Sequence, residues 1–290
     1  WTMAIFKAAA IQMRSGTSVE RNTADLEKFV REAAEQGATY VQTPEMTGAL
    51  VRDQEARKAA FTSEDRDLIV ATAAQLAAEL GIFVHIGSTA ILRADGKLAN
   101  RALLFGPDGG HIATYDKIHM FDVDLDNGES WRESSAYEPG TQAMVADLSI
   151  GKLGFAICYD LRFPQLFRAE ALAGAEILTV PAAFTRQTGE AHWHTLLRAR
   201  AIENGAWVIA AAQGGMHEDG RETYGHSLII DPWGRIVAEA DHAEPGVIIA
   251  EIDTAQSSAA RRKVPNLKNA REFNVATAAG PAPALKGAAS

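Results

Sequence analysis

Apolar residues occur along this chain in short runs, some of them continuous and some at helical spacing, separated by turn residues. The run over 4–13 is apolar enough to predict a strand. Apolar residues then recur every three or four positions over 26–34, which predicts a helix that ends at Gly37. A short strand over 39–43 follows, and directly after it comes Glu45. This order of strand, helix and strand is typical of an α/β protein.

The next part of the chain predicts one helix and three strands. We expect the helix to begin after Ser63, because Glu64 and Asp65 suit the positive end of a helix, and to end at Gly81. The strands are predicted over 82–92, 98–105 and 112–117. An Asp-Gly pair between the first two of these strands is a strong signal for a tight hairpin turn.

A polar, irregular stretch over 118–140 separates these strands from the second half of the chain. A loop of about twenty residues is long for a compact domain, and loops of that length are usually functional or disordered. Because this one begins and ends beside the candidate catalytic residues described below, we predict that it is functional.

The second half continues the mixture of strands and helices. Strands are predicted over 153–157, 176–181, 206–213, 224–231, 235–240 and 247–252, and helices over 164–173 and 191–203. No repeat, linker or change in composition divides the chain, so we expect one α/β domain over 4–273. Residues 276–290 are mostly Ala, Gly and Pro with little to bury, which predicts a flexible tail. Periodicity alone leaves open whether there is one sheet or two.

Composition narrows the class of protein. Of the 290 residues, 47% are hydrophobic and 22% are charged, which is ordinary for a soluble globular enzyme. A net charge of −9 argues against a nucleic-acid-binding surface, which needs clustered Lys and Arg. No apolar run approaches the ~18 residues that span a bilayer, so we expect a cytoplasmic protein with no membrane partner. The single cysteine excludes an intrachain disulfide framework and a Cys-rich zinc site.

That cysteine, Cys158, lies where the predicted strand over 153–157 ends, and Pro164 suits the first turn of a following helix. A strand, a sharp turn and a helix present a side chain to a cleft and leave backbone N–H groups free for an oxyanion. The alternative is a buried cysteine that acts as a small hydrophobic residue. Tyr159, Asp160 and Arg162 fit that alternative less well, because a core position would oblige all three to find polar partners. The local sequence leaves both interpretations open.

A cysteine nucleophile needs a group that accepts its proton and groups that stabilise the oxyanion. Glu45 follows a strand, Lys117 ends another, and Glu133 lies in the long loop. Taken one at a time, each fits a solvated surface charge better than a catalytic group. Their shared placement at strand ends, where sheets deliver residues to a cleft, favours a common site.

Six motifs carry a resemblance to a known family. They are T-P-E (43–45), Y-D-K-I-H-M-F-D-V-D (115–124), R-E-S (132–134), I-C-Y-D-L-R-F-P (157–164), A-H-W-H-T-L-L-R-A-R-A-I-E-N (191–204) and Y-G-H-S-L-I-I-D-P-W-G (224–234). In this order and spacing, the chain from 4 to 273 resembles the nitrilase, or carbon-nitrogen hydrolase, superfamily. The set is highly specific for that superfamily.

The resemblance implies a four-layer α-β-β-α sandwich that associates into homodimers or larger homo-oligomers. It also implies that Glu45 is the general base, that Lys117 stabilises the tetrahedral intermediate, that Cys158 is the nucleophile and that Glu133 is the second glutamate. Asp160 matches its motif as a structural residue. The implied reaction hydrolyses a small-molecule amide to an acid and ammonia through a cysteine thioester, and it requires no metal or organic cofactor.

Elementary electrostatics is consistent with these roles. A lysine ammonium favours the thiolate of Cys158, and a carboxylate nearby accepts the thiol proton. We expect Lys117 and the backbone N–H of Tyr159 to stabilise the oxyanion.

Within the superfamily, A-A-A-Q-G-G-M-H-E (210–218) followed by Y-G-H-S is similar to the branch that includes deaminated-glutathione amidase, more than to the omega-amidase branch. Thr185, Arg186 and Gln187 depart from the small or apolar residues expected there. We expect substrate contacts from Tyr159, Arg162, Phe184, Arg186 and Gln213. A substrate carboxylate would pair with Arg162, Arg186 or Arg221, although each also fits a surface ion pair.

Three other interpretations remain. A papain-like enzyme would use one of the eight histidines as base, but nothing in the sequence puts one beside Cys158. His192 and His194 could suggest a metal, yet their spacing of two residues points them apart on a helix. A binding or scaffolding homologue would have kept the fold and lost the reaction, which the joint presence of Glu45, Lys117 and Cys158 disfavours. Among enzymes, an omega-amidase, another aliphatic amidase and a nitrilase stay open.

Overall fold

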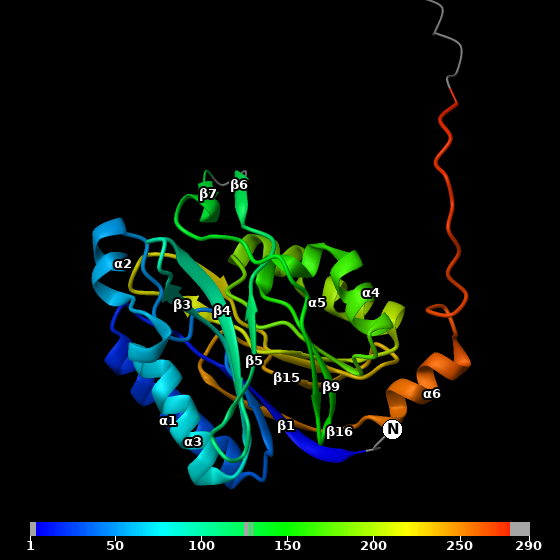
Figure 1. Ribbon diagram of the computed structural model, residues 1–290, viewed down its shortest axis with the longest axis horizontal. Coiled ribbons are helices and arrows are strands. Elements are labelled where there is room, and N and C mark those ends of the chain that lie inside the picture. Colours follow the sequence, from blue (N-terminus) through cyan, green and yellow to red (C-terminus); the bar gives the residue numbers. More distant parts are fainter. Residues whose placement is uncertain (1–3, 125–127, 129, 279–290) are drawn as a thin grey trace, which may run out of the picture.

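Two six-stranded sheets form the centre of the computed structural model, which describes residues 4–124, 128 and 130–278 (Figure 1). The first sheet has the strand order β16-β1-β2-β3-β4-β5. Its strands are β1 (Ile5–Gln12), β2 (Tyr40–Gln42), β3 (Phe83–Leu92), β4 (Leu98–Phe105), β5 (His111–Asp116) and β16 (Gly246–Asp253). β1, β2 and β3 are parallel, whereas β16 pairs with β1 in the antiparallel direction.

The second sheet has the order β15-β14-β11-β10-β9-β8. Its strands are β8 (Val145–Leu148), β9 (Gly151–Phe155), β10 (Ile177–Thr179), β11 (Trp207–Ala210), β14 (Leu228–Ile230) and β15 (Ile236–Glu239). Two small hairpins lie outside the sheets, and they pair β6 (Asp122–Asp124) with β7 (Ser130–Arg132) and β12 (Gly214–Met216) with β13 (Glu222–Tyr224).

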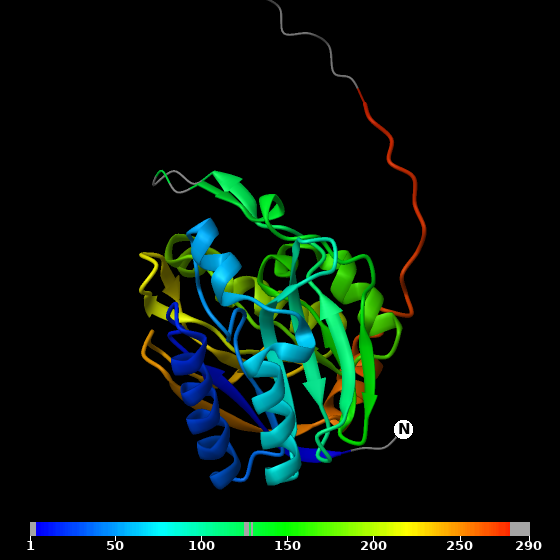
Figure 2. The same ribbon diagram turned by 60° about the vertical axis from the view of Figure 1, so that its left-hand side comes forward.

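Helices cover the outer face of each sheet (Figures 1 and 2). α1 (Val19–Glu35) and α3 (Leu68–Leu80) pack on the first sheet, and α4 (Pro164–Leu172) and α5 (Arg186–Asn204) lie on the second. The shorter helices are α2 (Gln54–Ala60), α6 (Ala255–Lys263) and the 3₁₀ turns η1 (Glu64–Arg66), η2 (Glu133–Ser135) and η3 (Cys158–Arg162). The four layers are the predicted α-β-β-α sandwich, in one domain.

The central strands are buried on both faces, which explains why they read as continuous apolar runs. In β1, Ala8 and Ala10 belong to the core that the two sheets share, and Ala9 and Ile11 belong to the core under α1 and α3. This alternation follows from the two-residue period of a strand. The two sheets therefore share a buried apolar core, which leaves little room for polar side chains between them.

Several predicted boundaries were wrong. The helix expected after Ser63 begins at Leu68, because Asp67 rather than Ser63 caps it, with the Asp67 carboxylate accepting the N–H of Val70 at 3.0 Å. Over 118–140 the chain forms the β6–β7 hairpin and η2 instead of an irregular loop throughout. α5 begins five residues before the predicted 191, and Gly189 fits there because a Cβ would lie 2.3 Å from the Cβ of Tyr224.

The elements α2, α6 and β8 and the hairpin of β12 and β13 were not predicted either. Of the predicted tail over 276–290, only 276–278 lie within the described residues, and these have no regular secondary structure. Across the described ranges, no helix combines the length and the apolar character needed to cross a bilayer.

Candidate active site

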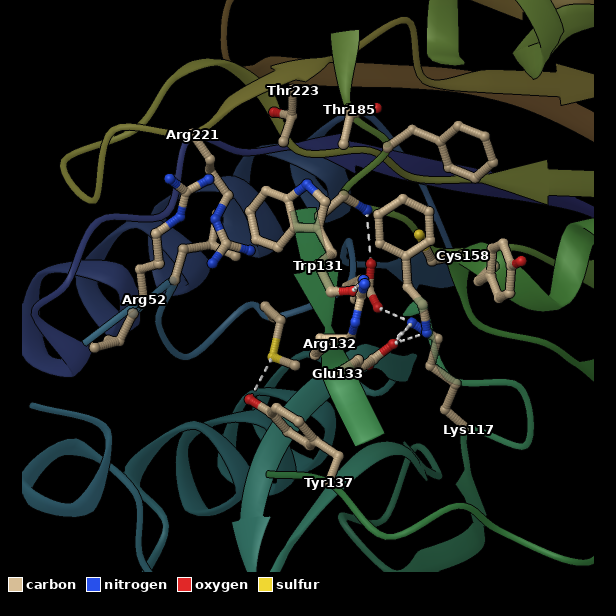
Figure 3. Close-up of a pocket in the computed structure, with 18 of the residues that line it drawn as sticks. Arg52, Lys117, Trp131, Arg132, Glu133, Tyr137, Cys158, Thr185, Arg221 and Thr223 are labelled. Carbon is tan, nitrogen blue, oxygen red and sulfur yellow. Dashed lines mark hydrogen bonds and ion pairs between the residues drawn. The ribbon is translucent and has the colours of Figure 1, made fainter. Parts of the chain in front are cut away.

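Strand ends from both sheets converge on one pocket. Glu45 follows β2, Lys117 directly follows β5, and Cys158 lies three residues after β9. Glu133 comes from η2, directly after β7. Figure 3 shows Lys117, Glu133 and Cys158 around the same space. The structure thus brings together the four residues that the sequence singled out.

Cys158 lies at a strained bend. Its φ is +50°, a left-handed conformation that is uncommon for a residue with a side chain and is often found at functional sites. The N–H of Cys158 donates to Pro181 O at 2.9 Å, which fixes the bend against the end of β10. Tyr159 is the next residue in the first turn of η3, where backbone N–H groups lack helical acceptors. Its N–H is therefore available for an oxyanion.

The ammonium of Lys117 lies between two carboxylates. Its Nζ is 2.9 Å from Glu45 Oε1, and it is 3.1 and 2.9 Å from the two carboxylate oxygens of Glu133. Glu45 Oε2 accepts the N–H of Ala183 at 2.8 Å, and Glu133 Oε2 accepts the N–H of Phe121 at 2.7 Å. The side chain of Lys117 is only 2% exposed, so these contacts replace its solvation.

Asn100 belongs to this cluster and was missed at the sequence level. Its Nδ2 donates to Glu45 Oε1 at 2.9 Å and to Glu133 Oε1 at 3.0 Å, so one neutral amide links the two carboxylates. Asn100 lies inside β4, next to β5, which carries Lys117. The only signal in the sequence was an amide in a mostly apolar strand.

Burial and charge set the protonation of Glu45 and Lys117. Burial by itself would raise the pKa of Glu45, but the charge and hydrogen bond of Lys117, with weaker help from Cys158 and Asn100, lower that pKa below its usual value. Burial would likewise lower the pKa of Lys117, but the charges of Glu133 and Glu45 hold it well above its usual value. Glu45 is therefore an ionised carboxylate and Lys117 an ammonium at neutral pH.

Opposing effects act on the thiol of Cys158. Burial and the negative charge of Glu45 raise its pKa well above the usual value, and the opposing charge of Lys117 does not compensate. The charge of Lys117 lowers the pKa of the thiol, as expected, but burial and Glu45 have the larger effect, so the thiol stays protonated until a base accepts its proton. Since Glu45 is ionised and interacts with the thiol through a hydrogen bond, it can accept the proton as the thiol attacks.

Asp160 connects the bend to the strand that carries Lys117. Its buried carboxylate accepts the N–H of Ile157 at 2.9 Å and the hydroxyl of Tyr115 at 2.7 Å through one oxygen. The other oxygen accepts the N–H of His119 at 3.0 Å and lies 2.6 Å from His119 Nδ1. Tyr115 and His119 flank Lys117 in sequence, so Asp160 holds the lysine and the cysteine in register, consistent with the predicted structural role.

The pocket has a volume of about 380 Å³ and is lined by residues from both halves of the chain (Figure 3). Three of the predicted substrate-binding residues line it: Tyr159, Arg162 and Phe184. The guanidinium of Arg162 lies over the rings of Tyr159 and Phe184, at 5.9 and 5.5 Å from their centroids. This wall therefore offers a cation on an aromatic surface close to Cys158.

The other two predicted substrate-binding residues are not part of the pocket lining. Arg186 is exposed and pairs with Glu190 and Glu222 at 2.9 and 2.7 Å. Gln213 is fully buried, and its Nε2 donates to Glu45 O at 3.1 Å and to Ser15 Oγ at 2.8 Å. Gln213 therefore supports the backbone of Glu45 from outside the pocket.

The lining also contains cations that sequence reasoning did not single out. Arg52, Arg57 and Arg132 line the pocket together with Arg221, which had been a candidate for binding a carboxylate. Trp131 of β7 projects among them (Figure 3). These residues come from a loop with its adjoining helix and from two hairpins that are far apart in the sequence, so no local sequence pattern could have grouped them.

Two sheets packed face to face, with a buried carboxylate, a lysine and a thiol delivered from their strand ends, are the arrangement of the carbon-nitrogen hydrolases, and the protein is an enzyme of that class. The chain belongs to the carbon-nitrogen hydrolase family, whose model matches residues 7–262. This finding confirms the predicted superfamily.

Relatives of known name support the predicted branch. The chain is 39% identical over 266 residues to deaminated glutathione amidase from Yersinia enterocolitica, covering 91% of this chain and 92% of the relative. It is 38% identical to deaminated glutathione amidase from Bos taurus, covering 91% and 81%. Both relatives are amidases by name, and the protein is an amidase of the same branch.

Solved structures agree with this fold. The C. elegans NitFhit protein superposes with a TM-score of 0.86 at 33% identity, and the match covers 93% of this chain and 66% of that one. An amidase variant from Nesterenkonia superposes with a TM-score of 0.75 at 25% identity, covering 89% and 94%. Its structure shows the acetamide moiety of fluoroacetamide added covalently to the active-site cysteine.

Proposed function

We propose that the protein hydrolyses a small ω-amide to the carboxylic acid through a thioester on Cys158, with deaminated glutathione or a close analogue as substrate. The observation that carries the proposal is the position of Glu45. One of its oxygens contacts the Lys117 ammonium, and the carboxylate also interacts with the thiol of Cys158. A base, a cation and a nucleophile therefore meet in one buried cluster.

Acylation begins with proton transfer from Cys158 Sγ to Glu45 as the sulfur attacks the amide carbonyl carbon. The carbonyl oxygen becomes an oxyanion, which Lys117 and the N–H of Tyr159 stabilise. The ammonium of Lys117 contacts one oxygen of Glu45 and both oxygens of Glu133. One of its N–H groups can therefore turn to the oxyanion while another keeps its hydrogen bond to Glu133. Glu45 then returns the proton to the nitrogen as the C–N bond breaks, and ammonia or an amine leaves.

Deacylation uses the same residues. Glu45 accepts a proton from water, the resulting hydroxide attacks the thioester carbonyl, and the oxyanion forms again beside Lys117. Collapse of this intermediate breaks the C–S bond, and the sulfur takes the proton back from Glu45. The acid leaves, and the thiol and the carboxylate are restored. Glu133 keeps the ammonium in place throughout.

The substrate assignment rests on the relatives and on the pocket. Relatives that match nearly the whole chain are named for deaminated glutathione. Arg162 beside Cys158 suits a carboxylate close to the scissile amide. An omega-amidase that acts on 2-oxoglutaramate-like substrates is the second candidate, because it requires the same cation.

The test is release of ammonia or amine from a panel that contains deaminated glutathione, 2-oxoglutaramate and neutral aliphatic amides, with Cys158→Ala as control. We expect turnover by the wild type only. Mass spectrometry of protein quenched during turnover should show an acyl adduct on the peptide with Cys158. Absence of turnover on every amide would leave the binding or scaffolding homologue as the better explanation, and an adduct elsewhere would overturn the mechanism.

A further inference from the structure

The pocket is cationic although the protein is acidic. Six cations line it, against three carboxylates, while the whole chain has a net charge of −9. Two of the three carboxylates, Glu45 and Glu133, contact Lys117, and the third, Glu222, pairs with Arg186 outside the lining. No ion pair within the described residues joins a lining arginine to these three carboxylates, although Arg132 pairs with Asp124 and Arg221 with Asp219 outside the lining.

Arg52 and Arg221 share one aromatic ring. The guanidinium carbon of Arg52 lies 4.5 Å from the centroid of Trp131, and that of Arg221 lies 4.9 Å from it. Figure 3 shows both arginines on the far side of Trp131 from Cys158. Two guanidinium groups over one ring repel each other, and an anion between them would relieve that repulsion.

These cations have few partners of their own. Arg221 pairs with Asp219 only through Nε, at 2.8 Å, and Arg52 makes no ion pair within the described part of the chain. Arg57 donates through a terminal nitrogen to Arg52 O at 3.1 Å, and its buried Nε has no hydrogen-bond partner among the described residues. A buried donor without a partner costs stability, so a ligand that accepts from it would bind favourably.

We propose that Arg52 and Arg221, which share the ring of Trp131, form with Arg57, which donates to Arg52 O, a subsite for a carboxylate of the substrate that lies remote from the scissile amide. The inference rests on the proposed amidase function and extends it. Arg162 stands beside Cys158 and these arginines stand beyond Trp131, so the pocket accepts a substrate with two anionic ends. A short primary amide would leave the remote arginines without a partner.

The test uses matched pairs of amides, each with a terminal carboxylate in one member and its uncharged methyl ester in the other. The carboxylate lies on the acyl side in half of the pairs and on the amine side in the rest. Arg52→Gln and Arg221→Gln are compared with the wild type. Arg93→Gln is the matched control. Arg93 is a surface residue paired with Asp95, and its substitution changes the net charge by the same amount.

We expect Arg52→Gln and Arg221→Gln to lower kcat/KM for the preferred anionic amide by about tenfold or more, through KM, while the ester is turned over as before. Arg93→Gln should behave as the wild type. Equal losses on acid and ester, or no loss on either, would overturn the subsite and leave the amidase function intact. Absence of turnover on all pairs would count against the proposed function.

A binding measurement keeps the subsite testable without turnover. Calorimetry of glutarate with Cys158→Ala protein should give a Kd that rises by about tenfold or more when Arg52→Gln is added. An unchanged Kd would overturn the subsite whatever the activity. A parallel titration with glutaramide, which has no charge, should be insensitive to Arg52→Gln.

Discussion

The carboxylate of Asp160 lies 2.6 Å from Nδ1 of His119, across the gap between the two sheets' strand ends. This contact joins the bend that carries Cys158 to the segment that follows Lys117. Asp160 has no solvent exposure, and its oxygens accept from donors on both sides of that gap. The distance between nucleophile and lysine therefore depends on one carboxylate that does not line the pocket.

Asp160→Asn should impair both stability and catalysis. The new amide keeps one acceptor oxygen and turns a donor toward groups that are themselves donors, so we expect a loss of about 1–3 kcal/mol in the free energy of unfolding. We also expect kcat to fall by about tenfold or more, because the register of Cys158 and Lys117 is loosened. Urea denaturation and steady-state kinetics measure the two effects. Asp147→Asn, on an exposed carboxylate that pairs with Lys152 outside the pocket lining, is the control. An Asp160→Asn protein with unchanged stability and normal kcat would contradict the role of Asp160.

Asn100→Ala should move the acidic limb of the kcat/KM profile. The amide of Asn100 donates to Glu45 and helps to lower its pKa. Loss of the donor raises the pKa of Glu45, so the base becomes protonated at a higher pH and activity declines earlier as the pH falls. A profile that keeps its acidic limb while kcat drops would mean that Asn100 acts on packing alone.

Glu45→Gln should separate thiolate formation from turnover. The charge of Glu45 is one of the causes that raise the pKa of Cys158, and its removal leaves Lys117 as the nearest charge on the thiol. The pKa of Cys158 should therefore fall, and thiolate absorbance in the ultraviolet should develop at a lower pH than in the wild type. Amide hydrolysis should nevertheless be lost, because no base remains. A higher thiol pKa in Glu45→Gln would contradict this account.

Gly87→Ala should destabilise the protein and disturb the site. A Cβ at Gly87 would lie 2.0 Å from Thr43 O and 2.4 Å from Pro181 Cβ, at the backbone that leads to Glu45 and the carbonyl that fixes Cys158. We expect a loss of about 3 kcal/mol or more in thermal unfolding experiments. Gly246→Ala is the matched control, because nothing lies within 4 Å of its Cβ position. Equal Tm values for the two variants would contradict the close approach.

His85 should make the protein sensitive to acid. Burial lowers its pKa from 6.5 to about 3, and its Nδ1 is 2.7 Å from the hydroxyl of Tyr40. Between these two pH values the unfolded chain binds a proton that the folded protein does not. Stability is therefore lost as the pH falls below the unfolded pKa, by up to about 5 kcal/mol. Unfolding free energies of wild type and His85→Gln at several acidic pH values check this, and parallel pH curves would contradict it.

Much of the fold could be predicted because its strands and helices carry local signals. Apolar runs marked most strands, and Gly81 ended its helix in the left-handed conformation expected of glycine. α6 had no such signal, since its sequence is polar. It is held by Arg261, whose terminal nitrogen donates to Ala175 O, and by Ser257, which donates to Glu176 O at 2.9 Å. Partners that are remote in sequence decide such an element, and periodicity does not encode them.

The residues of the candidate site also fall into those that could be predicted from the sequence and those that could not. Glu45, Lys117 and Cys158 stood at predictable strand ends, and the family resemblance assigned their roles. Asn100 and the cationic lining could not be grouped, because β4, the hairpins and the loop before α2 meet only after the two sheets have packed. The pKa of Cys158 likewise depends on burial, which cannot be predicted from the sequence motif around the cysteine.

The pairing of β1 with β16 has a consequence for biosynthesis. β1 holds residues 5–12, and its antiparallel partner extends to Asp253. A ribosome must therefore synthesise all the residues between β1 and β16 before this edge of β1 is covered, and until then a row of backbone donors and acceptors stays open to other chains. Loss of β16 by premature termination should therefore give aggregation rather than a smaller active enzyme.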